Sequence, residues 1–155
     1  MNTIKRVRKA NVTDAALILD LTRQAYKKWI PVIGREPRPM IADYETAVKN
    51  HLVYIYEEGG SAIGLIEMIA ESEYLLIENL AVLPESQGRG IGELLLNYAD
   101  SVAKGLGMQE VRLYTNEAFV DNVRFYQKRG YSTFRRAQIE TGGTSVHMSK
   151  AVEKE

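Results

Sequence analysis

Apolar and polar residues follow two rhythms along this chain, and the two rhythms predict an alternation of strands and helices. Period-two alternation, or a short apolar run closed by a turn, predicts strands at 4–8, 52–56, 62–70, 74–83, 110–115, 133–139 and 144–149. Apolar residues three and four apart predict helices at about 13–28, 43–50, 90–104 and 118–129. The resulting order, β-α-α-β-β-β-α-β-α-β-β, predicts a mixed α/β layer fold, which some schemes would class as α+β.

Two segments, the first helix and a proline-rich stretch, carry further predictions. The first helix is expected to be capped by Thr13 or Asp14 and to bury a mixed face. That face would consist of Ala16, Leu17, Leu19, Asp20 and Ala25. Residues 29–42 contain three of the four prolines, so this segment is predicted to be irregular.

Composition narrows the class of protein. With 155 residues, the chain is expected to form one domain over 1–155, with 151–155 as a loose tail. Its 20 basic and 20 acidic residues balance, which argues against nucleic acid or an anionic membrane as the main partner. Cysteine is absent, and no stretch approaches 18 consecutive apolar residues. We therefore expect a cytoplasmic protein without thiolate chemistry.

The segment between the strand at 74–83 and the helix at 90–104 carries the most specific signal. It reads Gln87-Gly88-Arg89-Gly90-Ile91-Gly92. Glycines allow the backbone to approach a ligand closely, and the free N–H groups at a helix N-terminus attract anions. A P-loop would need a lysine and a hydroxyl after the last glycine, but Glu93 follows it; a dinucleotide fingerprint would need glycine at 93.

The pattern that residues 87–92 do match is Q/R-x-x-G-x-G/A, and a second pattern follows it downstream. Tyr126 and Gly130-Tyr131 give Tyr-x-x-x-Gly-Tyr on a short helix stopped by glycine. With both patterns in this order, the chain resembles the GNAT superfamily of N-acetyltransferases over roughly residues 74–137. The resemblance implies a mostly antiparallel sheet of six or seven strands with helices on both faces.

The resemblance also implies a site for acetyl-coenzyme A between the strands at 74–83 and 110–115. The donor's pantetheine arm would pair with Leu80, Ala81 and Val82, and its pyrophosphate would bind amides of Gln87, Gly88, Arg89, Gly90, Ile91 and Gly92. Arg89 either adds charge beside the phosphates or is a solvated arginine. In this family an asparagine seven residues before the tyrosine often contacts the arm, but Phe119 stands there. Asn122 is a candidate replacement.

The reaction implied is direct attack of a primary amine on the thioester. A protonated amine must lose a proton, and Glu78 is our candidate base. Period two would place it on the same strand face as Leu80 and Val82, and the alternative is a surface glutamate. Tyr126 is the candidate to protonate, or hydrogen-bond to, the departing thiolate.

The acceptor is less defined. Tyr26, Trp29, Arg35 and Glu36 are candidates for contact with an amine of a small molecule or a peptide. His51 and His147 stand without other ligand-type residues at metal-binding spacing, so no metal site is expected. The basic cluster around Arg6 and Arg8 is expected to be a solvated strand face. If a homodimer forms, we expect it through the last strands.

Two alternatives stay open. The chain could be a non-catalytic acyl-CoA-binding or interaction module on the same fold, because a fold alone does not determine chemistry. The acyl group could also differ from acetyl.

Overall fold

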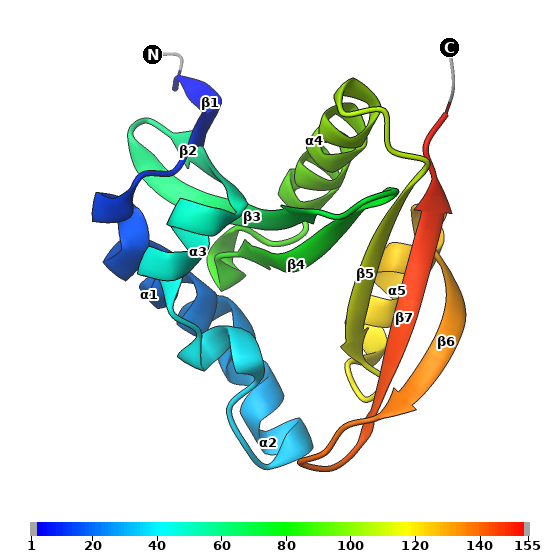
Figure 1. The fold of residues 1–155 in the computed structure, drawn as a ribbon. Helices are drawn as coiled ribbons and strands as arrows, with labels where there is room; N and C mark the ends of the chain where they lie inside the picture. Colours follow the sequence, from blue (N-terminus) through cyan, green and yellow to red (C-terminus); the bar gives the residue numbers. More distant parts are fainter. Residues whose placement is uncertain (1–2, 154–155) are drawn as a thin grey trace.

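The computed structural model describes residues 3–153 and is centred on one seven-stranded sheet (Figure 1). The strand order is β1-β2-β3-β4-β5-β7-β6, and every neighbouring pair is antiparallel except β4 and β5. The strands are β1 (Lys5–Lys9), β2 (Leu52–Glu58), β3 (Ser61–Ala70), β4 (Tyr74–Val82), β5 (Glu110–Asn116), β6 (Ser132–Gln138) and β7 (Thr144–Ala151). The α-helices are α1 (Ala15–Tyr26), α2 (Ile30–Ile33), α3 (Tyr44–Asn50), α4 (Ile91–Gly105) and α5 (Val120–Lys128). Short 3-10 turns are η1 (Val12–Asp14), η2 (Lys27–Trp29), η3 (Arg38–Ile41) and η4 (Pro84–Ser86).

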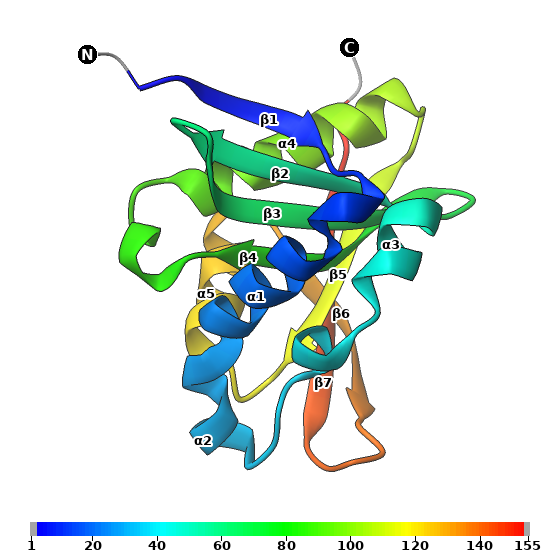
Figure 2. The same cartoon turned by 90° about the vertical axis from the view of Figure 1, so that its left-hand side faces the viewer.

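Helices cover both faces of the sheet, as the sequence predicted. Helices α1 and α3 lie on one face of β2, β3 and β4 (Figure 2). Their apolar residues, such as Ile18 and Ala47, pack with Ile55 and Leu65 of the strands. On the opposite face, α4 and α5 bury a second core in which Leu95 meets Ile66, Met68 and Met148. The sheet therefore separates two apolar layers, and the few polar residues buried in them are exceptions.

Helix α1 differs in detail from its prediction. Asn11 is the capping residue, because its side chain accepts from the Thr13 backbone N–H at 3.0 Å. The buried residues of α1 are Ile18, Leu21, Thr22 and Ala25, with spacings of three and four. Of the predicted face (Ala16, Leu17, Leu19, Asp20 and Ala25), only Ala25 is buried. The prediction missed Thr22, a polar residue that is fully buried and whose hydroxyl accepts a hydrogen bond from Asn79, a partner that the local sequence does not reveal.

The proline-rich segment is more regular than predicted. It forms the single turn α2 and the 3-10 turn η3. Pro31 stands in the first turn of α2, where the backbone N–H that proline lacks would have no helical partner in any case. Gly34 ends this turn with a φ of 73°. Proline therefore starts these turns rather than preventing them.

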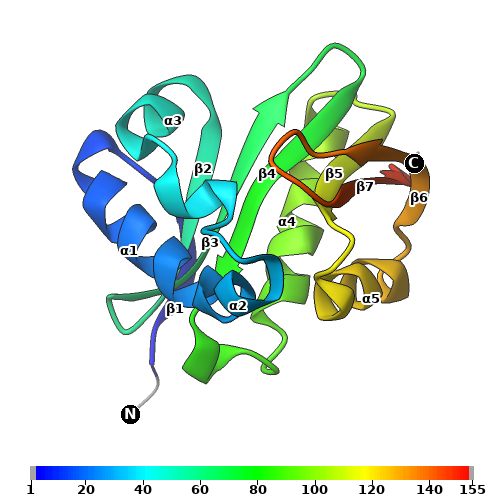
Figure 3. The ribbon, with the colours of Figure 1, turned by 90° about the horizontal axis from the view of Figure 1, so that it is seen from below.

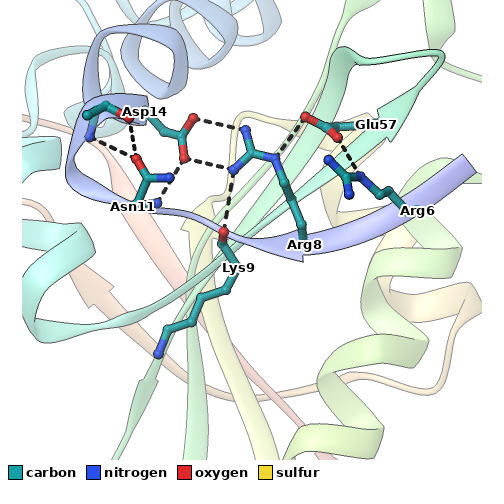
Figure 4. Close-up of polar contacts among 7 residues, drawn as sticks. Arg6, Arg8, Lys9, Asn11, Asp14 and Glu57 are labelled. Carbon is teal, nitrogen blue, oxygen red and sulfur yellow. Dashed lines mark hydrogen bonds and ion pairs between the residues drawn. The ribbon is translucent and has the colours of Figure 1, made fainter.

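The basic cluster on β1 is partly internal rather than fully solvated (Figure 4). The Arg8 guanidinium donates to both oxygens of Asp14, at 2.8 and 2.9 Å, and to Glu57 at 2.8 Å. Arg6 donates to the other Glu57 oxygen at 2.9 Å. Both carboxylates are buried, and these hydrogen bonds lower the pKa of Asp14 and of Glu57. Arg8 thus links β1, η1 and β2.

The C-terminal segment hydrogen-bonds to the sheet further along the chain than predicted. Strand β7 continues to Ala151, and the Val152 backbone N–H donates to the Gln109 carbonyl at 2.9 Å. Of the tail predicted to be loose, residues 154–155 lie outside the described residues. No helix in the described range 3–153 is long and apolar enough to cross a membrane.

Candidate active site

A gap opens in the sheet where β4 and β5 stop pairing. Their parallel pairing runs only from Tyr74–Glu110 to Ile77–Leu113, although β4 continues to Val82 beside β3. Figure 1 shows the two strands diverging from that point. In the register between β3 and β4, Met68 pairs with Ile77 and Glu67 pairs with Asn79. Glu78 of β4 is therefore the extra residue of a β-bulge. A bulge bends a strand, and this one lies where the gap begins.

A cavity of about 500 Å³ lies along this gap. Leu80, Ala81 and Val82 line it from β4, and Asn122 and Tyr126 line it from α5. The glycine-rich turn closes one end through Gln87, Gly88, Gly90, Ile91 and Gly92, and Tyr26 and Trp29 approach from α1 and η2. The structure therefore brings most of the predicted donor residues and two of the predicted acceptor residues around one cavity.

The glycine-rich turn needs its glycines for two different reasons. Gly88 and Gly90 have φ values of 81° and 85°, and Gly90 caps α4 in the left-handed conformation. At Gly92 the reason is space, because a Cβ there would lie 2.9 Å from Cζ of Phe125. The first residues of α4 consequently line the cavity, and the turn packs directly on α5.

Side chains of this turn are already engaged. The Gln87 side chain donates to the Val82 carbonyl at 3.0 Å and accepts from Lys28 at 3.2 Å. Arg89 donates to both oxygens of Glu58, at 2.7 and 2.9 Å, and does not line the cavity. Of the two interpretations of Arg89, the one with charge beside a phosphate has the less direct support.

Tyr126 lies deep in the cavity wall and is buried. Its ring contacts Phe125 and Tyr131 edge-on, with centroid distances of 5.4 and 5.9 Å. Burial raises the pKa of Tyr126 well above its usual value, so the hydroxyl stays protonated and can donate a hydrogen bond.

Glu78 does not share a face with Val82, which corrects the prediction. Val82 packs with Ile91 and Leu95 in the core beside α4. Glu78 instead accepts a hydrogen bond of 2.8 Å from the Tyr114 hydroxyl. Tyr114 projects away from that core, because its neighbour Leu113 points into it. The bulge breaks period two, and a register irregularity of this kind leaves no mark in the sequence of β4 alone.

A buried polar network next to Glu78 was missed by the sequence analysis. Asn79, which is 3% exposed, donates to Thr22 and to the Tyr44 hydroxyl, at 3.1 Å each. Its oxygen accepts from Tyr26 at 2.9 Å, and Tyr44 donates to the Pro39 carbonyl at 2.6 Å. Five residues from four segments thus fix α1, η3 and α3 on the bulge. No local motif could have revealed the network, because its members are 35 to 57 residues apart from Asn79.

A buried carboxylate, that of Glu67, lies on the same side of the sheet as Glu78. Glu67 is 4% exposed and lies 2.6 Å from Nδ1 of His51. Burial raises the pKa of Glu67, and His51 opposes that rise. His51 thus has an acidic partner that its sequence neighbours did not suggest. No cluster of three metal-ligating side chains occurs among the described residues.

The four predicted acceptor residues separate into two pairs. Tyr26 and Trp29 line the cavity, and Trp29 stacks on Phe119 at 4.5 Å across the gap. Arg35 and Glu36 do not line the cavity. Arg35 donates to the Gly142 carbonyl at 3.0 Å, joining the α2 segment to the β6–β7 hairpin at the lower edge of Figure 1, the side of the molecule that faces the viewer in Figure 3. Glu36 pairs with Arg23 at 2.6 Å.

The fold and cavity define an α/β domain with a glycine-rich turn beside a split sheet, and sequence comparison identifies its family. The model described as Acetyltransferase (GNAT) domain matches residues 49–133. This chain belongs to the GNAT acetyltransferase family, so the predicted resemblance is confirmed.

Individual relatives add detail to the fold. A segment of 74 residues is 35% identical to the uncharacterized protein YdhI of Bacillus subtilis, covering 48% of this chain and 45% of that relative. The match therefore spans less than half of that relative's length. The IAA acetyltransferase of Bacillus cereus has a TM-score of 0.73 at 23% identity, over 96% of this chain and 99% of the other. The PaiA N-acetyltransferase of Thermoplasma acidophilum, solved with coenzyme A, has a TM-score of 0.77 at 21% identity over the same shares.

Proposed function

We propose that this chain transfers an acetyl group from acetyl-CoA directly to a primary amine of a small molecule or a peptide. The observation that carries the proposal is the gap between β4 and β5, with the glycine-rich turn at one end and Tyr126 in its wall. Glu78, at the bulge, borders the same gap.

The cavity suits an elongated, phosphorylated donor. Beyond Ile77 the β5-facing edge of β4 has no paired strand in the described part of the chain, so an extended amide-bearing arm can pair there. The turn offers backbone N–H groups to a pyrophosphate, and its positive-φ glycines allow close approach. When bound, acetyl-CoA supplies an activated thioester carbonyl. Related folds have been solved with coenzyme A and with acetyl-CoA, which supports the same ligand here.

The two predicted catalytic side chains suit opposite ends of the proton balance. Glu78 can accept the proton that the amine loses as its nitrogen bonds to the acyl carbon. Tyr126 keeps its proton because of its raised pKa, so it can hydrogen-bond to the thiolate as the carbon–sulfur bond breaks. Direct attack needs no covalent enzyme intermediate, and the chain contains no cysteine.

The first test is thermal unfolding with acetyl-CoA, coenzyme A, ATP and NAD in parallel. A ligand at about 100 times its Kd adds about 2.7 kcal/mol to the free energy of unfolding, which raises Tm by several degrees. We expect the rise only with the two coenzyme A compounds. A larger rise with ATP or NAD would overturn the proposal.

The second test separates catalysis from binding alone. A panel of amines is assayed for release of the coenzyme A thiol, with the acetylated product identified by mass spectrometry. Binding of acetyl-CoA without amine-dependent thiol release and without any acetylated amine would favour the non-catalytic acyl-CoA-binding module. Propionyl-CoA and succinyl-CoA in the same assay define the acyl preference.

A further inference from the structure

The proposed function assigns no role to Tyr114, which stands on β5 directly after the last residue paired with β4. Its hydroxyl donates to Oε1 of Glu78 at 2.8 Å across the opening gap. We infer that Tyr114 is a positioning residue that holds the Glu78 carboxylate toward the acceptor amine. This inference rests on the proposed function, and it adds a residue that neither motif contains.

The side chain of Tyr114 is supported by the neighbouring strand β7. It lies opposite His147 in the β5–β7 register, and the two rings stack with centroids 5.6 Å apart at 28°. His147 in turn lies 3.2 Å, Nε2 to Oγ, from Ser145 on the same strand. A ring stacked on a neighbouring strand keeps few alternative rotamers, so the direction of its O–H bond is restricted. His147, to which the sequence analysis assigned no role, thus supports the Tyr114 side chain that donates to Glu78.

Glu78 needs such support because of its place in the bulge. A bulged residue has no partner in the β3 register, so its side chain lacks the cross-strand neighbours that orient others. The Tyr114 hydroxyl occupies Oε1, while Oε2 has no partner among the residues that the structure describes. One oxygen is thus anchored, and the other stays available to accept the amine proton.

The electrostatics favour a donor at this position. Burial and the charge of Glu78 both raise the pKa of Tyr114, so its hydroxyl remains protonated and can only donate to the carboxylate. Glu67 lies within electrostatic reach of Glu78 on the same side of the sheet. A hydrogen bond to Glu78 offsets part of the repulsion between these two carboxylates.

The first experiment tests the contact without any substrate. Glutamate labelled with 13C at the side-chain carboxyl is incorporated, and the Glu78 resonance is assigned from its loss in Glu78→Gln. We expect Tyr114→Phe, which removes only the hydroxyl, to shift this resonance. The matched control is Tyr74→Phe. Tyr74 lies on β4, as Glu78 does, but its ring contacts Arg112 rather than Glu78. An unmoved resonance in Tyr114→Phe would overturn the inference.

The second experiment tests the consequence for turnover. With an amine found by the thiol-release screen, we expect Tyr114→Phe to lower kcat about tenfold, the size of one lost hydrogen bond to a charged group. The affinity for coenzyme A should stay unchanged. In the Glu78→Gln background, Tyr114→Phe should cause no further loss, since it acts only through Glu78.

The outcomes separate cleanly. A tenfold loss that persists in the Glu78→Gln background would mean that Tyr114 acts independently of Glu78, and the inference would fall. If no amine is acetylated while the resonance still moves, the proposed function fails and the contact has only a structural role. If amines are acetylated and Tyr114→Phe matches the wild type in kcat, the function stands and the inference fails.

Discussion

The two sides of the gap between β4 and β5 are built in opposite ways. The side proposed for the donor consists mainly of one continuous, glycine-rich segment, from Leu80 to Gly92. The side proposed for the acceptor consists of side chains that hydrogen-bond across long stretches of sequence, such as Asn79 with Tyr26 and Tyr44. A ligand that is the same throughout a family can be bound by backbone, whereas one that varies requires side chains that can be exchanged.

This difference predicts that substitutions on the two sides change different quantities. Donor-side changes should alter the Kd for coenzyme A, and acceptor-side changes should alter turnover at constant Kd. Each prediction below can break that separation.

Glu78→Gln should have the largest effect. Removing a general base costs about 100-fold to 10,000-fold in kcat/KM for the amine. The Kd for coenzyme A, measured by calorimetry, should stay the same. Glu71→Gln is the control, because Glu71 is exposed in the turn before β4. A loss below threefold in Glu78→Gln would leave Glu78 as an ordinary strand glutamate.

Tyr126→Phe should have the second largest effect, about 10-fold to 100-fold in kcat, because a buried donor to the leaving sulfur is lost. Tyr131→Phe is the matched control. Tyr131 contacts the Tyr126 ring, and its own buried hydroxyl has no partner in residues 3–153. Steady-state rates of the two variants decide the point. Equal losses in both would assign the effect to packing rather than chemistry.

Gly90→Ala should weaken coenzyme A binding several-fold with little change in kcat. A side chain at its φ of 85° costs roughly 1–2 kcal/mol, which distorts the turn or lowers the free energy of unfolding. Gly105→Ala, at the end of the same helix with open space around it, should instead stabilise by roughly 0.5–1 kcal/mol. Calorimetry and thermal unfolding of both variants provide the check; unchanged affinity in Gly90→Ala would argue against phosphate binding at this turn.

The smallest expected effect lies away from the gap, at the Arg8 cluster, and concerns stability rather than turnover. Asp14 and Glu57 have folded pKa values below their usual 3.8 and 4.5, so they bind protons more readily in the unfolded chain. Their contribution is complete above about pH 5 and is lost as the pH falls through the lowered folded pKa values. The free energy of unfolding, measured from pH 6 to pH 2, should therefore fall less steeply in Arg8→Gln than in wild type. Arg6→Gln should resemble wild type more closely, because Arg6 bonds only Glu57.

The elements around the proposed donor side were predicted better than the contacts on the proposed acceptor side, for the same physical reason. Strand 74–83 and helix 90–104 appear as β4 (Tyr74–Val82) and α4 (Ile91–Gly105), because their patterns are contiguous. The glycine-rich turn between them depends on local glycine conformations, which the sequence states directly.

The acceptor side could not be predicted to the same extent. The side chain of Glu78 turns toward Tyr114 because of a bulge defined by two strands together. Arg35 and Glu36, predicted to contact substrate, are engaged by Gly142 and Arg23. Such contacts depend on distances between elements, which neither periodicity nor composition encodes.

The short seam between β4 and β5 has a consequence for the living cell. Only four residue pairs, from Tyr74–Glu110 to Ile77–Leu113, join the two halves of the sheet by strand pairing. A donor lying along Leu80 to Val82 would serve as the strand that is missing there. The folded population of this protein would then depend on the level of a metabolite, because each bound molecule completes the sheet.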